Sequence, residues 1–303
     1  FIGSHLVYRL YREGFETIVY DNLSTGKLGN IPSNEGGTRP LKVIRGDVRD
    51  PKKLERSLDG VDAVVHLAAV VSIKLSIENP LLVHEVNATG TLQLLRACVK
   101  RKVRRFLFAS SAAVYSETPQ KSRETDLPKP LSPYGASKAA GEAYCSAFYK
   151  AHGLETIVFR FMNVYGPRSS SGPYSGVMNK FANSVLQTRP LIVFGSGRQS
   201  RDFVYVSDVV EALVRGLKSS KAVGEILNVG TGTSTTINRL SQLFRGFNPP
   251  CEIIHKEPRV GEIRHSCADV RNAERLLGFS SEIPLQEGVR RFLSWHRSSH
   301  NRH

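Results

Sequence analysis

Short apolar runs alternate with longer amphipathic stretches through the first half of the chain. The apolar runs are rich in Val, Ile and Leu with few internal charges, which predicts strands buried on both faces. They lie at 17–20, 41–45, 63–66, 105–109 and 156–160. Helical periodicity between them predicts helices over 4–13, 51–58, 80–100 and 134–152. This alternation predicts an α/β fold, a doubly wound parallel sheet of the Rossmann-like kind.

The pattern is looser after the last of these strands. Residues 163–200 are rich in Gly, Ser and Pro, and residues 22–40 are a polar stretch that predicts a long loop. Further on, the pattern predicts helices over 206–217, 237–244, 272–277 and 285–297, and strands over 225–229 and 252–255. We predict a Rossmann domain over 1–162 and a smaller, interleaved lobe over 163–303, with 201–232 returning to the Rossmann domain.

The longest apolar run, 63–73, is interrupted by His66 and Ser72 and is too short to span a bilayer. We interpret it as a buried strand and expect no membrane partner. The cysteines are far apart and show no CxxC pairing; they are Cys98, Cys145, Cys251 and Cys267. We therefore expect neither a metal site nor disulfides, and a reducing compartment such as the cytoplasm.

The chain is strongly basic, with 42 Lys and Arg against 27 Asp and Glu, a net charge of +15 and a pI near 9.8. Such a balance often indicates nucleic-acid binding. The basic residues are scattered, however, and the main cluster, 100–105, lies at a helix end before a strand. Because no nucleic-acid-binding motif accompanies the charge, we favour a basic composition with a site for anionic phosphates over a nucleic-acid surface.

A dinucleotide site in this fold needs a glycine-rich turn at a helix N-terminus and an acid at the end of the second strand. Gly3 could be the last glycine of such a turn, or simply a glycine at a helix start. Asp21 ends a predicted strand and follows Gly3 at about the expected spacing. A carboxylate there would bind ribose hydroxyls and repel a 2′-phosphate, which favours NAD over NADP; the alternative is a turn-forming Asp beside Asn22. Asp47 follows the next strand and allows the same two interpretations.

Tyr134 and Lys138 stand four residues apart at a helix start, after Pro133. A nearby ammonium stabilises phenolate, which makes a tyrosine usable as a general base. Ser111 ends a predicted strand and could hydrogen-bond the same substrate oxygen. The alternatives are an ordinary helical pair for Tyr134 and Lys138, and a turn former for Ser111.

Together these residues belong to a longer series of segments that resembles the extended short-chain dehydrogenase/reductase family, in particular the UDP-glucose 4-epimerases among its nucleotide-sugar enzymes. The resemblance covers nearly the whole chain. Its carriers, in order, are FIGSHLV (1–7), VYDNLSTG (19–26), GDVRD (46–50), HLAA (66–69), NATGT (87–91), SSAAVY (110–115), YGASK (134–138), FRFMNVYGPR (159–168), RDFVYVSD (201–208), NVGTG (228–232) and RVGEIRHSCAD (259–269).

The resemblance implies a reaction and a role for each site residue. Tyr134 would remove the 4-hydroxyl proton of a UDP-hexose, Lys138 would bind the nicotinamide ribose and tune Tyr134, and Ser111 would steady the reacting oxygen. The residues implied to line the NAD site are Gly3, Asp21, Asn22, Asp47, Ala68 and Asn87, beside Tyr134 and Lys138. Those implied to face the UDP-sugar are Asn163, Arg201 and Arg259, with Ser266 near the sugar C2 substituent.

The family resemblance also implies a homodimer built through the helices at 80–100 and 134–152. In the family a first strand and further glycines precede the segment that Phe1 begins. The printed sequence holds no counterpart of them, so it resembles an N-terminally truncated member. We expect the chain as printed to bind NAD poorly and to be aggregation-prone.

Other outcomes within and outside the family remain open at this point. A 4,6-dehydratase would need an Asp-Glu pair after Ser111, and a UDP-glucuronate decarboxylase typically carries Glu at position 113; this chain has Ala112 and Ala113. Neutral residues there favour plain epimerisation, with a UDP-glucuronate 4-epimerase as a further alternative. The alternatives from other classes are a non-catalytic nucleotide-binding protein and an RNA-binding module.

Overall fold

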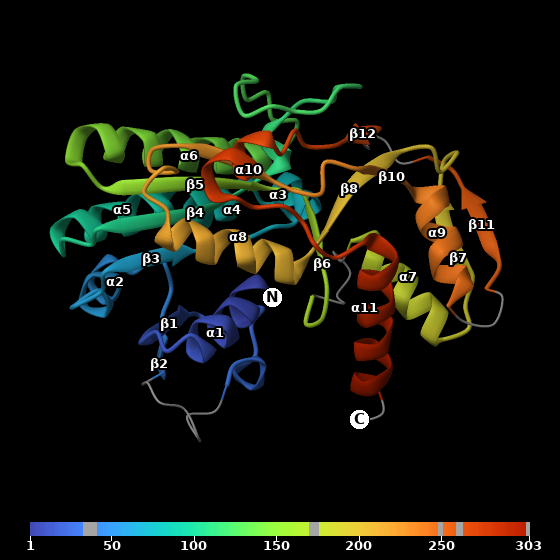
Figure 1. The fold of residues 1–303 in the computed structure, drawn as a ribbon, viewed down its shortest axis with the longest axis horizontal. Helices are drawn as coiled ribbons and strands as arrows, with labels where there is room; N and C mark the ends of the chain where they lie inside the picture. Colours follow the sequence, from blue (N-terminus) through green and yellow to red (C-terminus); the bar gives the residue numbers. More distant parts are fainter. Residues whose placement is uncertain (33–40, 170–175, 248–250, 259–262, 301–303) are drawn as a thin grey trace.

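The protein is described by a computed structural model that covers residues 1–32, 41–169, 176–247, 251–258 and 263–300 (Figure 1). The helices are α1 (Ile2–Arg12), α2 (Pro51–Ser57), α3 (Ile73–Glu78), α4 (Pro80–His84), α5 (Gly90–Lys100), α6 (Pro133–His152), α7 (Val177–Leu186), α8 (Val206–Lys218), α9 (Ile237–Gly246), α10 (Arg271–Leu277) and α11 (Leu285–His300). Shorter helical turns are η1 (Leu28–Asn30), η2 (Glu85–Thr89) and η3 (Ala112–Val114), of which η2 is a π-helix.

The strands are β1 (Thr17–Asp21), β2 (Leu41–Arg45), β3 (Ala63–His66), β4 (Arg105–Ser111), β5 (Glu155–Phe161), β6 (Asn163–Tyr165), β7 (Leu191–Phe194), β8 (Ser200–Tyr205), β9 (Ile226–Val229), β10 (Ser234–Thr236), β11 (Ile253–Lys256) and β12 (His265–Ser266). The main sheet has the order β3-β4-β5-β9 and all its pairings are parallel. This confirms the predicted α/β class and parallel sheet.

β1 and β2 form a separate parallel pair, in which Thr17 aligns with Leu41 and Asp21 with Arg45. The pair is not hydrogen-bonded to the four-stranded sheet among the described residues. Figure 1 shows β1 and β2 beside α1, at the β3 side of the main sheet. Within this pair Ile18 and Val43 are about 40% exposed, whereas Leu107 in β4 and Ile157 in β5 are fully buried.

Alternating side chains of β4 and β5 fill one hydrophobic core on each face of the main sheet. On one face Leu107 and Phe159 pack with residues of α8 and α10 and with Leu6 of α1. On the other face Phe106 and Phe108 pack with residues of α2, α5 and α6. Helices therefore cover both faces, as a doubly wound sheet requires.

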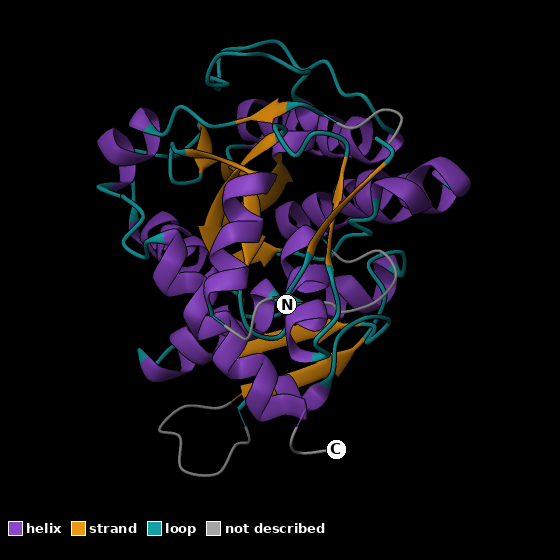
Figure 2. Cartoon of the chain, turned by 90° about the vertical axis from the view of Figure 1, so that its right-hand side faces the viewer, coloured by secondary structure: helices purple, strands orange, loops and turns teal. Residues whose placement is uncertain are grey.

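The smaller lobe has its own core and lies beside the main sheet (Figures 1 and 2). A second sheet runs β10-β8-β12, with β6 paired to β8, and β7 pairs with β11. Residues of α7, α9 and α11 close this core around Tyr165 and Phe203. Within 201–232, β8 lies in the sheet of the smaller lobe and β9 lies in the main sheet. This segment therefore passes from one sheet to the other.

Three sequence expectations need correction. The apolar run 63–73 is a strand only over β3; a loop follows, Val71 is 68% exposed, and α3 begins after Ser72, whose side chain accepts a hydrogen bond from the Leu75 amide. The predicted helix 80–100 is interrupted by the π-helical turn η2. The Gly-rich segment 163–200 holds β6, α7 and β7, which were not predicted. The two strands have three and four residues, too few to show periodicity.

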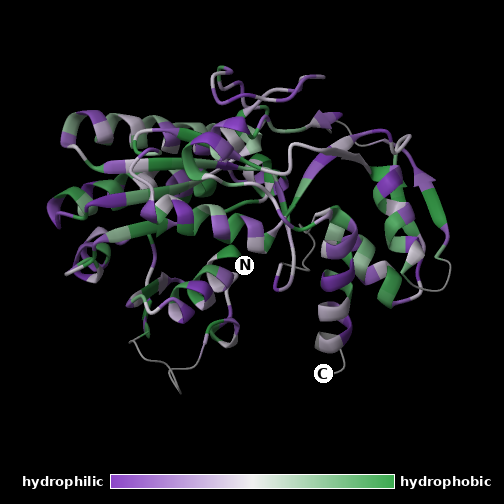
Figure 3. Cartoon of the chain, in the orientation of Figure 1, coloured by the Kyte–Doolittle hydropathy of each residue, from purple (hydrophilic) through white to green (hydrophobic). Residues whose placement is uncertain are grey.

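Figure 3, coloured by hydropathy, shows hydrophobic stretches in the strands of the main sheet and alternating hydrophobic and hydrophilic residues along the helices. In the described parts of the chain, no helix combines the length and the apolar character that crossing a membrane requires.

Candidate active site

The carboxyl end of β4 and the first turn of α6 bring the predicted catalytic side chains together. Ser111 is the last residue of β4, and Tyr134 lies in the first turn of α6. This helix begins sharply because Pro133 occupies its first turn and the Ser132 hydroxyl accepts a hydrogen bond from the Gly135 amide at 3.1 Å. Gly135 allows the close approach: an added Cβ would stand 2.2 Å from the Ala113 carbonyl oxygen.

Tyr134 is almost completely buried, with 8% of its surface exposed. Burial raises the pKa of its phenol, and a side-chain hydrogen bond with Ser111 opposes that rise. The structure therefore joins Ser111 and Tyr134, the pair that the sequence indicated, around one position where a substrate oxygen could bind.

Lys138 lies one turn further along α6 and is 3% exposed. Its Nζ donates a hydrogen bond of 2.8 Å to the carbonyl oxygen of Ala109 in β4 and lies 5.0 Å from the centre of the Phe108 ring. Burial lowers the pKa of Lys138 to about 8, and the Glu142 carboxylate acts in the opposite direction. The side chain is thus held beneath the end of β4, two residues before Ser111.

Asn87 belongs to the π-helical turn and is 1% exposed. Its Oδ1 accepts a 2.8 Å hydrogen bond from the Val70 amide, and its Nδ2 donates to the Val70 carbonyl at 2.9 Å and to Ser137 Oγ at 3.0 Å. Ser137 Oγ in turn donates to the Tyr134 carbonyl at 2.7 Å. Asn87 therefore ties the loop after β3, which carries the exposed Ala68, to the first turn of α6.

The acids predicted to bind the cofactor lie at the carboxyl ends of β1 and β2. Asp21 ends β1, and its Oδ1 accepts a hydrogen bond from the Leu23 amide at 2.7 Å. Asp47 follows β2 and accepts hydrogen bonds from Asn22 Nδ2 at 3.0 Å and from Arg49. The hydrogen bonds from Arg49 lower the pKa of Asp47 most strongly. Both acids thus stand at one edge of the β1–β2 pair, as parallel strands require.

The start of α1 faces this edge. Gly3 lies in the first turn, and an added Cβ would stand 3.6 Å from Leu67 Cδ1, an ordinary contact, so packing among the described residues does not require a glycine there. Arg168, which the sequence did not single out, donates to the Asn30 carbonyl at 2.6 Å and lies 4.9 Å above the Tyr8 ring of α1. An acid at the strand end and a cation beside a helix start fit the ribose and diphosphate of a dinucleotide.

The predicted substrate residues lie on the smaller lobe's sheet. Asn163 begins β6 and aligns with Phe203 of β8, while Arg201 of β8 aligns with Ser266 of β12. Paired residues project from the same face of a sheet, so Arg201 and Ser266 share one face. Arg259 falls outside the described residues.

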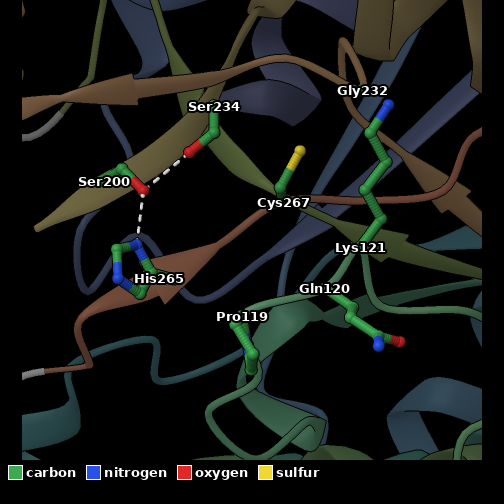
Figure 4. A pocket seen from close by; sticks show the side chains of 8 residues that line it. All are labelled: Pro119, Gln120, Lys121, Ser200, Gly232, Ser234, His265 and Cys267. Atoms are coloured by element: carbon green, nitrogen blue, oxygen red, sulfur yellow. Dashed lines mark hydrogen bonds between the residues drawn. The ribbon is translucent and has the colours of Figure 1, made fainter.

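The opposite face of the same strands lines a pocket of about 320 Å³ (Figure 4). There Ser234 Oγ donates to Ser200 Oγ at 2.7 Å, and Ser200 Oγ lies 3.1 Å from His265 Nδ1. Lys121 and Cys267 complete the far side. None of the predicted site residues lines this pocket. In the described parts of the chain, no cluster of His, Cys, Asp and Glu side chains could hold a metal ion.

Sequence reasoning missed a buried ion pair behind the catalytic residues, between Glu142 of α6 and Arg160 of β5. Arg160 Nη2 lies 2.7 Å from Glu142 Oε2 and its Nε lies 2.9 Å from Oε1, with 1% and 5% of the two side chains exposed. The available signal was an arginine inside the otherwise apolar strand TIVFRF.

Comparison with known proteins identifies a family and similar proteins. Residues 1–230 match the model of the NAD dependent epimerase/dehydratase family. A putative UDP-glucose 4-epimerase of Methanocaldococcus jannaschii is 36% identical over 99% of this chain and 96% of its own length. A UDP-N-acetyl-alpha-D-glucosaminuronate decarboxylase of Bacillus cytotoxicus is 31% identical, over 99% of this chain and 96% of its own length.

Among solved structures, the chain resembles UDP-glucose 4-epimerase of Thermotoga maritima with UDP-glucose. The TM-score is 0.93 at 35% identity, with 99% of this chain and 96% of that chain covered.

Proposed function

The chain belongs to the NAD dependent epimerase/dehydratase family, as an enzyme of that superfamily with NAD as its cofactor, and from this premise we propose that it inverts C4 of a UDP-hexose. UDP-glucose and UDP-galactose are the proposed pair, and N-acetylated UDP-hexoses are a proposed extension. The observation that carries the proposal is the placement of Ser111 at the end of β4 and of the buried Tyr134 and Lys138 one turn apart at the start of α6, with Lys138 hydrogen-bonded to β4.

In this proposal Tyr134 is the general base that takes the proton of the sugar 4-hydroxyl and later returns it. Ser111 holds the same oxygen, and the Lys138 ammonium favours the phenolate form of Tyr134 against the effect of burial. Bound NAD supplies the hydride acceptor and donor at C4, so no net oxidation results. The 4-keto sugar that forms would rotate within the site, so that the hydride returns to the other face of C4.

Asp21 and Asn22 are proposed to hold the adenosine ribose, with Asp47 beside the adenine and Gly3, Ala68 and Asn87 along the remainder of the cofactor. Asn87 would act through the loop after β3, because its own amide is used by Val70 and Ser137. Arg168 adds a positive charge beside the start of α1, where a diphosphate would lie.

The residues after Ser111 favour epimerisation over the other reactions of the superfamily. Ala112 and Ala113 belong to the turn η3, which directly follows Ser111. The Ala113 carbonyl is the group that Gly135 approaches. A dehydration or decarboxylation needs an additional acid or base at the sugar. Two methyl side chains at this turn cannot supply one.

Asn163, Arg201, Arg259 and Ser266 are proposed to bind the UDP-sugar. A planar guanidinium suits a diphosphate because it donates two parallel hydrogen bonds. The substrate would therefore lie between the end of β4, which carries Ser111, and the Arg201 face of β8. This division supports the proposed Rossmann domain over 1–162 and substrate lobe over 163–303.

We also propose that the protein is a homodimer through the helices at 80–100 and 134–152, with α3 beside them. Exposed apolar side chains gather along α3 and α4, where Ile77 is 66% and Leu81 is 75% exposed. Both helices pack against α6, so one continuous surface could cover the same surface of a second copy.

The function is tested by incubating the purified protein with UDP-glucose, UDP-galactose, UDP-N-acetylglucosamine and UDP-glucuronate separately, and identifying the products by NMR. We expect interconversion of UDP-glucose and UDP-galactose without release of carbon dioxide or water. Decarboxylation of UDP-glucuronate, or a 4-keto-6-deoxy product, would overturn the epimerase proposal.

A further inference from the structure

The Glu142–Arg160 pair lies directly behind the site and takes no part in the proposed reaction. Two buried charges held bidentately are costly to desolvate, and an apolar pair of similar size is often as stable. Stability alone is therefore a weak explanation for the pair. Its contacts indicate another role, because each of them leads to a residue next to the catalytic ones.

The first contact joins α6 to the end of β4. Ser110 Oγ donates a hydrogen bond to Glu142 Oε1, and Ser110 is 3% exposed and immediately precedes Ser111. Glu142 itself lies one helical turn after Lys138. One carboxylate thus contacts the strand residue beside Ser111 and stands on the helix face that carries Lys138.

The second set of contacts runs from Arg160 towards the smaller lobe. Arg160 Nη1 donates to the Tyr115 hydroxyl at 2.9 Å, and that hydroxyl donates to Asn228 Oδ1 at 2.8 Å. Asn228 Nδ2 then donates to the Ser122 carbonyl at 2.9 Å and to the Asp269 carbonyl at 3.1 Å. The pair is therefore held from β5, from the loop after η3 and from the segment after β12, which fixes the place of its charges.

The charges around Lys138 show what Glu142 adds. Lys138 is buried, and its Nζ donates to a neutral carbonyl of β4. The neutral Phe108 ring of β4 also faces it, with its centre 5.0 Å from Nζ. The titratable or charged groups around it are His66 of β3, Tyr134, Glu142 and Cys145 of α6, and Arg160 of β5 beyond Glu142. Glu142 is the carboxylate among them.

We propose that Glu142 is a positioning residue, which holds the catalytic helix against the end of β4 through Ser110 and Arg160 and keeps a negative charge one turn from the Lys138 ammonium. This inference rests on the proposed function of Tyr134 and Lys138. Glu142 touches neither substrate nor cofactor; it acts through its neighbours.

The test is Glu142→Gln, which keeps the shape of the side chain and removes its charge. We expect a folded, NAD-binding protein whose turnover is lower by about tenfold, with KM changed by less than about threefold. A carboxylate favours the protonated form of a nearby amine, so without it Lys138 loses its proton at lower pH. The alkaline limb of the turnover profile should therefore move about one unit towards lower pH.

Glu155→Gln is the matched control. Glu155 binds Arg105 at 2.6 Å, and this pair joins β5 to β4 at the opposite end of the strands. We expect it to lower stability without changing turnover or its pH profile. A folded Glu142→Gln protein that behaves in the same way would overturn the proposal.

A second variant covers the case in which Glu142→Gln fails to fold because Arg160 is left buried and unpaired. Glu142→Leu combined with Arg160→Met removes both charges together. We expect this protein to fold and still to turn over about tenfold more slowly, because Ser110 and Lys138 have lost the carboxylate. Wild-type turnover in the double variant would overturn the proposal.

Failure of the proposed function is recognised separately, because wild-type protein would then not interconvert the UDP-hexoses. Glu142 remains testable in that case by ultraviolet titration of the Tyr134 phenol, taken as the difference from Tyr134→Phe. We expect Glu142→Gln to shift the ionisation of Tyr134 to lower pH, because Lys138 is already neutral in that range and the phenolate no longer has a carboxylate on the same helix. An unchanged difference titration would overturn the positioning role.

Discussion

Lys138 Nζ donates its hydrogen bond to the carbonyl oxygen of Ala109, two residues before Ser111 on the same strand. The contact fixes the depth of α6 relative to β4. The helix cannot slide along the strand without breaking a buried hydrogen bond to an ammonium group, which is among the more costly to lose. Tyr134 and Ser111 therefore keep their relative place in the absence of substrate.

Tyr134→Phe should lower turnover of the UDP-hexose by about a hundredfold or more, because the general base is lost. NAD binding should change little, since the ring and its packing remain. Tyr144→Phe on the same helix is the control and should keep wild-type activity. The role of Tyr134 would be wrong if the variant retained more than about a tenth of the wild-type rate.

NAD should bind more tightly than NADP, because the Asp21 carboxylate at the end of β1 repels a 2′-phosphate. Isothermal titration calorimetry with each cofactor measures the ratio of the affinities for NAD and NADP. Asp21→Ser should narrow it, whereas Asp59→Asn, on an exposed turn beside Arg101, should leave it unchanged. Equal affinities in the wild type would remove Asp21 from the ribose site.

Gly135→Ala should separate α6 from η3, since the new Cβ would stand 2.2 Å from the Ala113 carbonyl oxygen. We expect a loss of about 1–3 kcal/mol in the free energy of unfolding and a marked loss of turnover. Gly246→Ala in α9 is the control, because no neighbouring atom lies within 4 Å of its added Cβ. Thermal unfolding and turnover of both variants decide the matter; equal behaviour of the two would contradict the close approach.

Acid should destabilise the protein partly through His66. Burial is the main cause that lowers the pKa of His66 to about 3 from 6.5, so the unfolded chain takes up a proton that the folded chain refuses. This contribution is absent above pH 6.5 and costs about 1.4 kcal/mol for each pH unit below it, down to about pH 3. His66→Gln should flatten that dependence in urea unfolding, with His5 unchanged in both proteins. An equally steep slope in the variant would show that His66 contributes nothing.

Ser266→Tyr should remove activity on UDP-N-acetylglucosamine and spare UDP-glucose, because a bulky side chain on the Arg201 face would fill the space for an acetamido group. His265→Tyr places a tyrosine on the opposite face of β12 and should change neither activity. Both substrates are assayed with both variants. Equal loss of the two activities in Ser266→Tyr would show that this residue does not select by size.

The parts of the molecule that could be predicted from the sequence are those with local signals. The strands of the main sheet follow continuous apolar runs, and Pro133 and Ser132 mark the start of α6. The family comparison confirms the fold and the cofactor, while the roles of the individual residues stay predictions. The Glu142–Arg160 pair could not be predicted because a strand and a helix must first be placed in register to bring the charges together.

The smaller lobe was less predictable for a different reason. β6 and β10 have three residues each and β12 has two. Such segments are too short for the two-residue alternation of a strand to be recognised in the sequence. All three pair with β8, although they lie far apart in the chain. They are strands because of this pairing and not because of local propensity.

The π-helical turn at Glu85–Thr89 makes the spacing of this stretch intolerant of deletion. Loss of one residue there would close the wider turn to a regular α-helix and move the side chains within it, Asn87 among them, to new directions around the helix axis. The Asn87 amide and the Thr91 hydroxyl, which lies 3.0 Å from His66 Nε2, could then no longer both reach their partners. The length of this segment is accordingly as constrained as the identity of its residues, and sequences that lack one position here should have a differently built approach to the catalytic helix.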